Sequence, residues 1–190
     1  LCELGVSLDF DQTVERFIGT SLPVCLQRVA DLTARPLPER FQSQFAARTR
    51  LRFEQELGVV AGVEDVLDSL ACAYCVASNG NRAKVDFTLG HTRLLARFNG
   101  RIFSADDVAA PKPAPDLFLF AARQMLALPS GTIVVEDTST GVQAACCAGM
   151  RAIGFAAMTP GPRLLAAGAY AIATTMPEVH ALLQAASAEV

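Results

Sequence analysis

The chain has no cluster of lysines and arginines and no long apolar run, and each absence excludes a class of protein. Its 16 basic and 19 acidic residues give a formal net charge of −3, with no basic run. We therefore expect neither nucleic acid nor an anionic membrane surface as a partner. No apolar stretch reaches the roughly 18 residues that a membrane-spanning helix needs. No basic and apolar leader is visible at the start, so we expect a cytoplasmic protein.

The sequence also lacks the paired cysteine motifs of a zinc or redox centre. Cys72 and Cys75 have C-x-x-C spacing, but no second such pair exists among the six cysteines. Cys146 and Cys147 are adjacent, so on a helix they point roughly 100° apart. His91 and His180 have no identifiable partner. We expect free thiols without a metal or redox role.

What the chain does have is ample apolar material, arranged in two patterns. Apolar residues make up 52% of 190 residues, enough for one domain, or one domain with a small insert. Up to about residue 56, apolar residues recur only at helical spacing. Beyond residue 58, apolar strands alternate with helices, which predicts a parallel sheet with helices on both faces. The expected strands are 71–77, 101–103, 132–135, 151–155 and 170–173. The expected helices are 63–70, 82–95, one opened by 110–115 and running to 126, 139–148 and 177–186.

Polar residues follow three of these elements, at the sheet edge where parallel α/β folds bind ligands. They are Ser78, Asn79 and Gly80, then Lys112 between two prolines, then Glu136 and Asp137.

Each of these clusters has both a functional and a structural interpretation. Ser78-Asn79-Gly80 can bind an anion through a hydroxyl and backbone N–H groups, or can be a plain turn. Lys112 can neutralise a phosphate, or can be a solvated lysine in a proline loop. The Glu136–Asp137 pair is tolerable beside a hard cation such as Mg²⁺, although Asp137 or Thr138 could instead cap the next helix. Together they supply a phosphate donor, a charge clamp and Mg²⁺ ligands, so they predict phosphoryl transfer.

Three segments resemble the second, third and fourth motifs of the haloacid dehalogenase-like hydrolases: VASNG, KPAPDLF and VVEDTSTGVQAACCAGMRAIGF. The nearest group is the helical-cap phosphatases and β-phosphoglucomutases. The resemblance implies a Rossmann-like core at residues 59–190 and a small all-helical cap at 1–58. It also implies that Ser78 binds the phosphoryl group, that Lys112 orients it, and that Glu136 and Asp137 hold Mg²⁺. VERFIGTS resembles the substrate-facing loop of the cap, which places Arg16 and Gly19 near the leaving group.

The family's first motif, Asp-x-Asp-Gly-Thr, has only an imperfect counterpart at Asp9–Thr13. Gln12 replaces the turn glycine, the residues before Asp9 form a poor strand, and the residues after it have helical spacing. We interpret Asp9 or Asp11 as the cap of a helix. The nucleophilic aspartate is then expected on a segment of roughly 25–35 residues that precedes Leu1, an estimate from ordinary element lengths. The less favoured alternative makes Asp9 the nucleophile and Asp11 its partner.

These inferences predict a Mg²⁺-dependent hydrolase of small phosphorylated metabolites that works through an aspartyl-phosphate. The alternatives are a phosphomutase with the same chemistry, a catalytically dead binding or regulatory module, and a metal-independent 2-haloacid dehalogenase. We expect a monomer or a weak homodimer.

Overall fold

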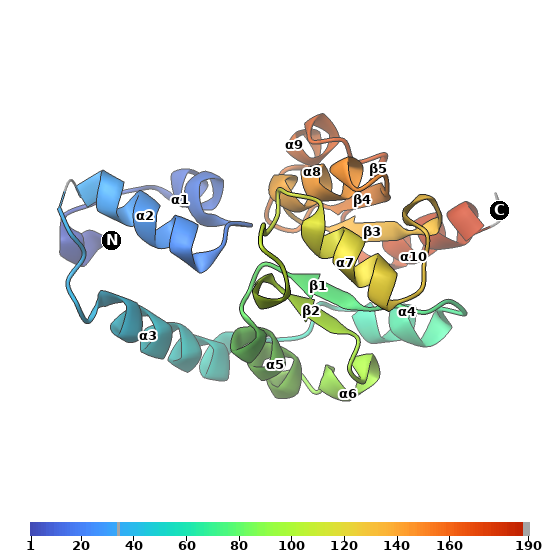
Figure 1. Cartoon of the computed structure of the whole chain (residues 1–190), viewed down its shortest axis with the longest axis horizontal. Helices are drawn as coiled ribbons and strands as arrows, with labels where there is room; N and C mark the ends of the chain where they lie inside the picture. Colours follow the sequence, from blue (N-terminus) through green and yellow to red (C-terminus); the bar gives the residue numbers. More distant parts are fainter. Residues whose placement is uncertain (34, 188–190) are drawn as a thin grey trace.

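A computed structural model describes residues 1–33 and 35–187 as a group of helices beside an α/β core (Figure 1). The helical part, which we call the cap, contains η1 (Cys2–Leu4), α1 (Phe10–Phe17), α2 (Leu22–Thr33) and α3 (Phe41–Glu56). The core contains, in chain order, α4 (Val63–Ser69), β1 (Val76–Ser78), α5 (Arg82–His91), α6 (Leu95–Phe98), β2 (Ile102–Ser104), η2 (Ala105–Asp107), α7 (Asp116–Gln124), η3 (Pro129–Gly131), β3 (Ile133–Glu136), α8 (Ser139–Cys147), β4 (Arg151–Phe155), α9 (Gly161–Ala166), β5 (Ala171–Ala173) and α10 (Met176–Ser187). The α/β fold predicted from the sequence is confirmed.

The strands form two parallel sheets whose facing edges are not joined. β1 pairs with β2, so that Ser78 lies opposite Ser104, and β3, β4 and β5 pair in that order. Among the described residues, no strand bonds to the edge of β1 away from β2 or to the edge of β3 away from β4. The chain around these edges is correspondingly open: β1 is only half-buried, and Val135 in the middle of β3 is 40% exposed.

Helices cover both faces of the strands because alternate strand residues point to opposite sides. On β4, Ala152 packs into a cluster with α7, α8 and α9, whereas Ile153 packs with α4 and α10. Ala144 and Ala145 on α8 are fully buried, so this small-residue face lets α8 lie close to β3 and β4. This close packing fixes the first turn of α8 beside the end of β3.

Several predicted boundaries were wrong for identifiable reasons. The strand expected at 71–77 begins only at Val76. The helix expected over 82–95 breaks into α5 and α6, since Arg93 adopts a left-handed φ of 61°. Helix α9 was missed, because its short apolar sequence merges with the apolar residues after it. Within the described residues, no helix combines the length and apolar character needed to cross a membrane.

Candidate active site

A cavity of about 300 Å³ lies where β1 and β3 end, beside the loop that joins α1 to α2. It is lined by Gly19, Thr20, Ala77, Ser78, Asn79, Gly80, Lys84, Lys112, Val135, Glu136, Asp137 and Thr138. Seven of the eight predicted site residues are in this set. Residues separated by more than 100 positions in sequence therefore meet in one place.

Lys112 is buried rather than solvated. Its side chain lies over the ring of Phe118, with Nζ 4.6 Å from the ring centroid. The ammonium donates to the backbone oxygen of Ala77 on β1, at 2.9 Å, and forms an ion pair with Glu136 at the end of β3. The solvated-lysine alternative is wrong. The ammonium bridges the two unjoined sheets at the wall of the cavity.

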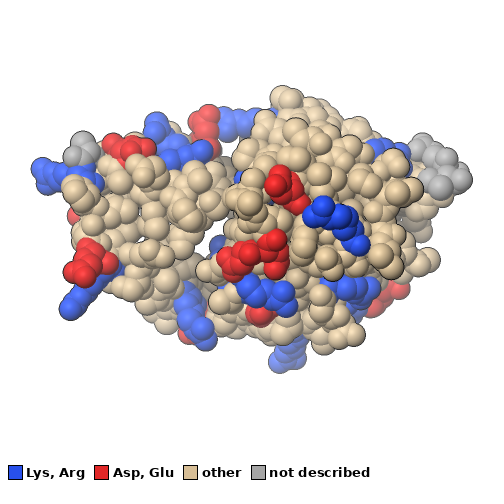
Figure 2. Space-filling view, in the orientation of Figure 1, with Lys and Arg blue, Asp and Glu red and all other residues tan. Residues whose placement is uncertain are grey.

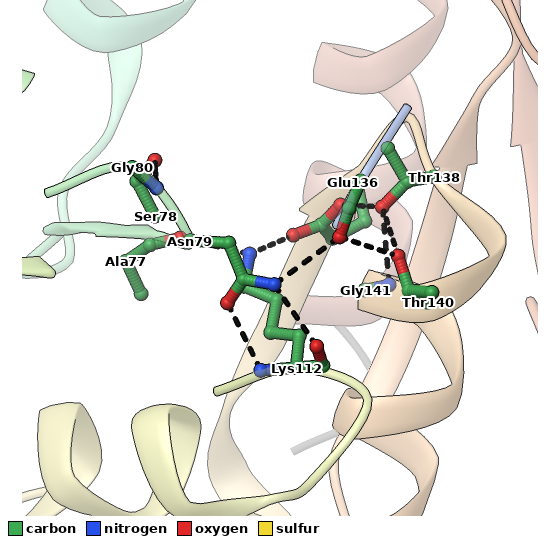
Figure 3. A network of polar contacts seen from close by, with 10 residues as sticks. Ala77, Ser78, Asn79, Gly80, Lys112, Glu136, Thr138, Thr140 and Gly141 are labelled. Atoms are coloured by element: carbon green, nitrogen blue, oxygen red, sulfur yellow. Dashed lines mark hydrogen bonds and ion pairs between the residues drawn. The ribbon is translucent and has the colours of Figure 1, made fainter. Parts of the chain in front are cut away.

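Glu136 is held from three sides, and both of its oxygens are engaged. One oxygen pairs with Lys112, and the other accepts a hydrogen bond from the Thr138 hydroxyl at 3.0 Å (Figure 3). The carboxylate also lies against Gly141 on α8, where any Cβ would collide with it. Removing either partner of such a buried pair leaves an uncompensated charge, so each fixes the other.

Asp137 differs from its neighbour, because its side chain is exposed to the cavity. The pKa of its carboxyl is raised, first because the surrounding protein partly desolvates it and second because Glu136 adds a like charge. Thr138, not Asp137, caps α8: its hydroxyl oxygen accepts from the N–H of Gly141 at 3.0 Å. Helix capping therefore does not account for Asp137.

Ser78 presents its hydroxyl at the carboxyl end of β1. Its oxygen accepts the N–H of Gly80 at 3.1 Å, so the hydroxyl proton points elsewhere and can donate to a ligand. Because this bond occupies the Gly80 N–H, that group does not donate to an anion as the sequence predicted. Gly80 contributes a tight turn beside the serine.

Asn79 uses its side-chain amide on the protein backbone. Its Nδ2 donates to the carbonyl oxygens of Gly19 and Lys112, at 3.1 and 3.0 Å, and its Oδ1 accepts the N–H of Lys112 at 2.9 Å (Figure 3). It thus ties the end of β1 to the lysine loop and to the cap. These contacts make Asn79 a positioning residue.

Gly19 is the point where the cap loop meets the core. Its carbonyl oxygen also accepts the Thr140 hydroxyl at 3.0 Å, so it is bonded both from the residue after β1 and from α8. Its φ is +75°, and a Cβ there would collide with the Thr140 hydroxyl and lie 2.8 Å from the Cβ of Thr138. Glycine is required on both counts. We call the bonds from Asn79 and Thr140 to Gly19 the clasp.

Arg16 is not brought to this cavity. It is exposed and lines a different hollow on the cap with Glu15, Arg28 and Asp31. Asp9 caps α1, since its carboxylate accepts the N–H of Gln12 at 2.7 Å and the Gln12 side chain accepts the N–H of Asp9. This confirms the helix-cap interpretation of the imperfect first motif, and neither Asp9 nor Asp11 lines the cavity.

Sequence reasoning missed three polar lining residues, Lys84, Thr20 and Thr138, and the clasp residue Thr140. Lys84 lies one turn into α5, beyond the strand-end rule that guided the prediction. Thr138 and Thr140 follow the acid pair. The sequence offered Thr138 as a helix cap, but neither threonine as a residue of the site. Within residues 1–33 and 35–187, no three His, Cys, Asp or Glu side chains gather closely enough to hold a metal ion.

Comparisons with known proteins agree with this architecture. Residues 3–155 match the family model described as haloacid dehalogenase-like hydrolase. The 6-phosphogluconate phosphatase of Escherichia coli K12 is 30% identical over 160 residues, covering 82% of this chain and 71% of that protein.

Two solved structures extend the match to the fold. A conserved haloacid dehalogenase-like protein of unknown function from Agrobacterium tumefaciens C58 superposes with a TM-score of 0.83 at 30% identity, covering 98% of this chain and 87% of that one. A putative β-phosphoglucomutase from Thermotoga maritima shares the fold, with a TM-score of 0.74 at 23% identity over 96% and 86% of the two chains. With the family match spanning most of its length, the chain belongs to the haloacid dehalogenase-like hydrolases.

Proposed function

We propose that this hydrolase cleaves phosphate monoesters of small sugar-like metabolites, and that the cavity between β1 and β3 holds the phosphoryl group. The observation that carries this proposal is the meeting of Ser78, Lys112 and Asp137 around one 300 Å³ cavity. A hydroxyl donor, an ammonium and a carboxylate are what binding and charge neutralisation of a phosphoryl group require. The relative named 6-phosphogluconate phosphatase supports a phosphorylated metabolite as substrate.

In this proposal the residues of the chain have distinct parts. Ser78 donates its hydroxyl proton to a phosphoryl oxygen, since its own oxygen already accepts from Gly80. Lys112 offers positive charge from a fixed position, because Ala77, Glu136 and the Phe118 ring hold its ammonium. The residues of the clasp keep the cap loop over the cavity, where Thr20 lines the wall. A covered site restricts water and favours one leaving group.

Of the two acids at the end of β3, Asp137 fits a magnesium site better than Glu136. Asp137 is exposed to the cavity, and no salt bridge in the described part of the chain includes its carboxylate. Both oxygens of Glu136 are engaged by Lys112 and Thr138, so we assign Glu136 the task of orienting Lys112. Asp137 would hold Mg²⁺, which is a hard cation that prefers carboxylate oxygens. When bound, the ion would supply charge neutralisation on the phosphoryl oxygens.

The attacking aspartate belongs, in our proposal, on a strand lodged between β1 and β3. The edges of β1 and β3 are unjoined, and Ala77 and Ser78 of β1 line the same cavity as the exposed Val135 of β3. Unpaired strand edges bind further strands readily. A carboxylate on such a strand would enter the cavity beside Ser78 and Lys112. Its attack on phosphorus would expel the alcohol and form an aspartyl-phosphate, which water then hydrolyses.

Release of inorganic phosphate from sugar phosphates, measured with and without Mg²⁺ on the natural full-length protein, tests this function. We expect activity that needs Mg²⁺ and falls with Asp137→Asn. Phosphate release without metal would contradict the Mg²⁺ requirement, and no release at all would favour the binding module or the dehalogenase alternative. A product that keeps its phosphate on another hydroxyl would identify a phosphomutase.

The position of the nucleophile has its own test. The acyl phosphate is trapped with hydroxylamine during turnover, and peptide mass spectrometry locates the modified aspartate. We expect the label on a peptide outside residues 1–190. A label on Asp9 or Asp11 would overturn the proposed strand and restore the less favoured alternative.

A further inference from the structure

Lys84 contributes a positive charge to the cavity that no other described residue neutralises. The charged residues lining the cavity are Lys84, Lys112, Glu136 and Asp137. Lys112 and Glu136 pair with each other, and within residues 1–33 and 35–187 Lys84 forms no ion pair. A cation facing a cavity without a partner attracts an anion from solution.

The base of the Lys84 side chain is fixed by its surroundings. Asn81 caps α5 by accepting the N–H of Lys84 at 2.9 Å. A Cβ on Gly80 would be 3.5 Å from Cδ of Lys84, so the aliphatic stem lies along the serine turn. The ammonium is 5.6 Å from the ring centroid of Phe53 on α3, a distance at which the ring attracts a cation without covering it.

This placement puts the ammonium between the phosphate-binding turn and the cap. Ser78 and Gly80 form the floor on one side, and Phe53 belongs to the cap helix on the other. The candidate metal ligand Asp137 comes from the other sheet, at the end of β3. A group bound by Lys84 would therefore lie on the cap side of the phosphoryl group, where the proposed function places the leaving alcohol.

We propose that Lys84 selects phosphate monoesters whose leaving alcohol carries a second anionic group, such as a carboxylate. This rests on the proposed function, because it places the phosphoryl group at Ser78 and Lys112. An alcohol without that charge leaves the ammonium with only the weak attraction of the Phe53 ring. An anionic alcohol forms an ion pair with it inside a partly desolvated wall, where charge pairs are stronger than in open water.

The test compares two open-chain compounds that differ in one group. 6-Phosphogluconate carries a carboxylate where sorbitol 6-phosphate carries a hydroxymethyl group. Binding of both, and of inorganic phosphate, is measured by calorimetry on the natural full-length protein with a chelator present to prevent turnover. We expect wild type to bind 6-phosphogluconate about three- to tenfold more tightly, the range of an exposed to partly buried ion pair.

Variants assign that preference to one residue. Lys84→Met keeps the aliphatic stem and should remove the preference, whereas Lys84→Arg should keep it. Arg82→Met is the control for net charge: it removes a cation from the same helix that pairs with Asp86 and does not line the cavity. The preference should survive that change.

Three results would overturn the inference. Equal binding of the two compounds by wild type, or an unchanged preference in Lys84→Met, would reject Lys84 while leaving the phosphate site intact. Failure of all three compounds to bind, inorganic phosphate included, would reject metal-free phosphate binding by Ser78 and Lys112, and the selection by Lys84 that rests on it.

Discussion

The cap and the core are built on different principles. The core buries continuous apolar clusters on both faces of its strands. The cap helices α1, α2 and α3 bury one apolar residue among those described, Val29, and leave Phe10, Phe45 and Leu51 exposed by about half or more. Figure 2 shows an opening between the atoms of the cap and those of the core.

Two groups of contacts among the described residues join the cap to the core. One is the clasp, where Asn79 and Thr140 bond the carbonyl of Gly19. The other joins α3 to α5, with Arg50 4.4 Å from the Phe87 ring centroid and Lys84 near Phe53. Segments with few buried contacts open at low free-energy cost. The side chains of the candidate site are therefore held by the core, whereas changing a few contacts is enough to displace the cap.

The largest effect should come from breaking the charge pair in the core. Lys112→Met should lower kcat/KM by about 100- to 1000-fold, because it removes a preorganised charge at the phosphoryl site. It also leaves Glu136 as a buried carboxylate without its cation, which lowers stability. The double variant Lys112→Met/Glu136→Gln should therefore recover stability but not activity. Steady-state kinetics and thermal unfolding measure the two effects separately.

The control is Arg123→Met, which removes an exposed cation stacked beside Phe120 on α7. It should leave kcat/KM unchanged. If Lys112→Met retained more than a tenth of the activity, the charge clamp in the proposed function would be wrong.

A smaller effect is expected from displacing the cap at Gly19. Gly19→Ala and Gly5→Ala both place a side chain at a left-handed φ, +75° and +77°, but only Gly19 has neighbours within 4 Å. Each should lose about 1 kcal/mol of stability from backbone strain. Gly19→Ala should in addition raise KM by roughly tenfold, since overpacking costs of 1–3 kcal/mol push the loop from the cavity. Equal kinetics for the two variants would contradict the assigned role of the clasp.

The predictable part of the site was the part encoded by local sequence. The end of an apolar strand placed Ser78, Glu136 and Asp137, and flanking prolines marked Lys112. The bonds of Asn79 were not foreseeable, because they depend on Gly19, which is 60 positions earlier, and on the lysine loop, 33 positions later. Such contacts follow from how the elements pack, which residue spacing does not encode.

In the fold, too, the elements set by local sequence were predictable and those set by a single unusual conformation were not. Strand β4 was predicted with its observed bounds, Arg151–Phe155, because the run Ala152–Phe155 carries no polar side chain and follows a glycine turn. The break between α5 and α6 was missed because it depends on one residue, Arg93, adopting a conformation that most residues avoid.

Removing one hydrogen bond of the clasp, without adding backbone strain, should have a smaller effect than Gly19→Ala. Thr140→Val removes one of the two hydrogen bonds to Gly19 and should cost about 0.5–1.5 kcal/mol. Hydrogen exchange of the amides in residues 17–21 should accelerate, while that of β4 stays unchanged. Thr132→Val is the matched control, since its hydroxyl bonds Leu128 within the core at 2.8 Å. Accelerated exchange at 17–21 in that control would show that the cap responds to general destabilisation.

The smallest effect, and the one that separates the two acids, concerns Asp137. Its raised pKa means that the folded protein holds this proton more tightly than the unfolded chain. Stability is then lost as the pH rises from the ordinary value of 3.8 through the raised pKa, so Asp137→Asn should raise the Tm of metal-free protein at neutral pH. The gain should be small because the side chain is exposed, and it should vanish below pH 3.8, where both states are protonated. Mg²⁺ should raise the Tm of wild type and not of the variant, since a cation bound only to the folded state stabilises it. If Mg²⁺ raised the Tm of both proteins equally, Asp137 would not be the metal ligand, and Glu136 would be assigned that role instead.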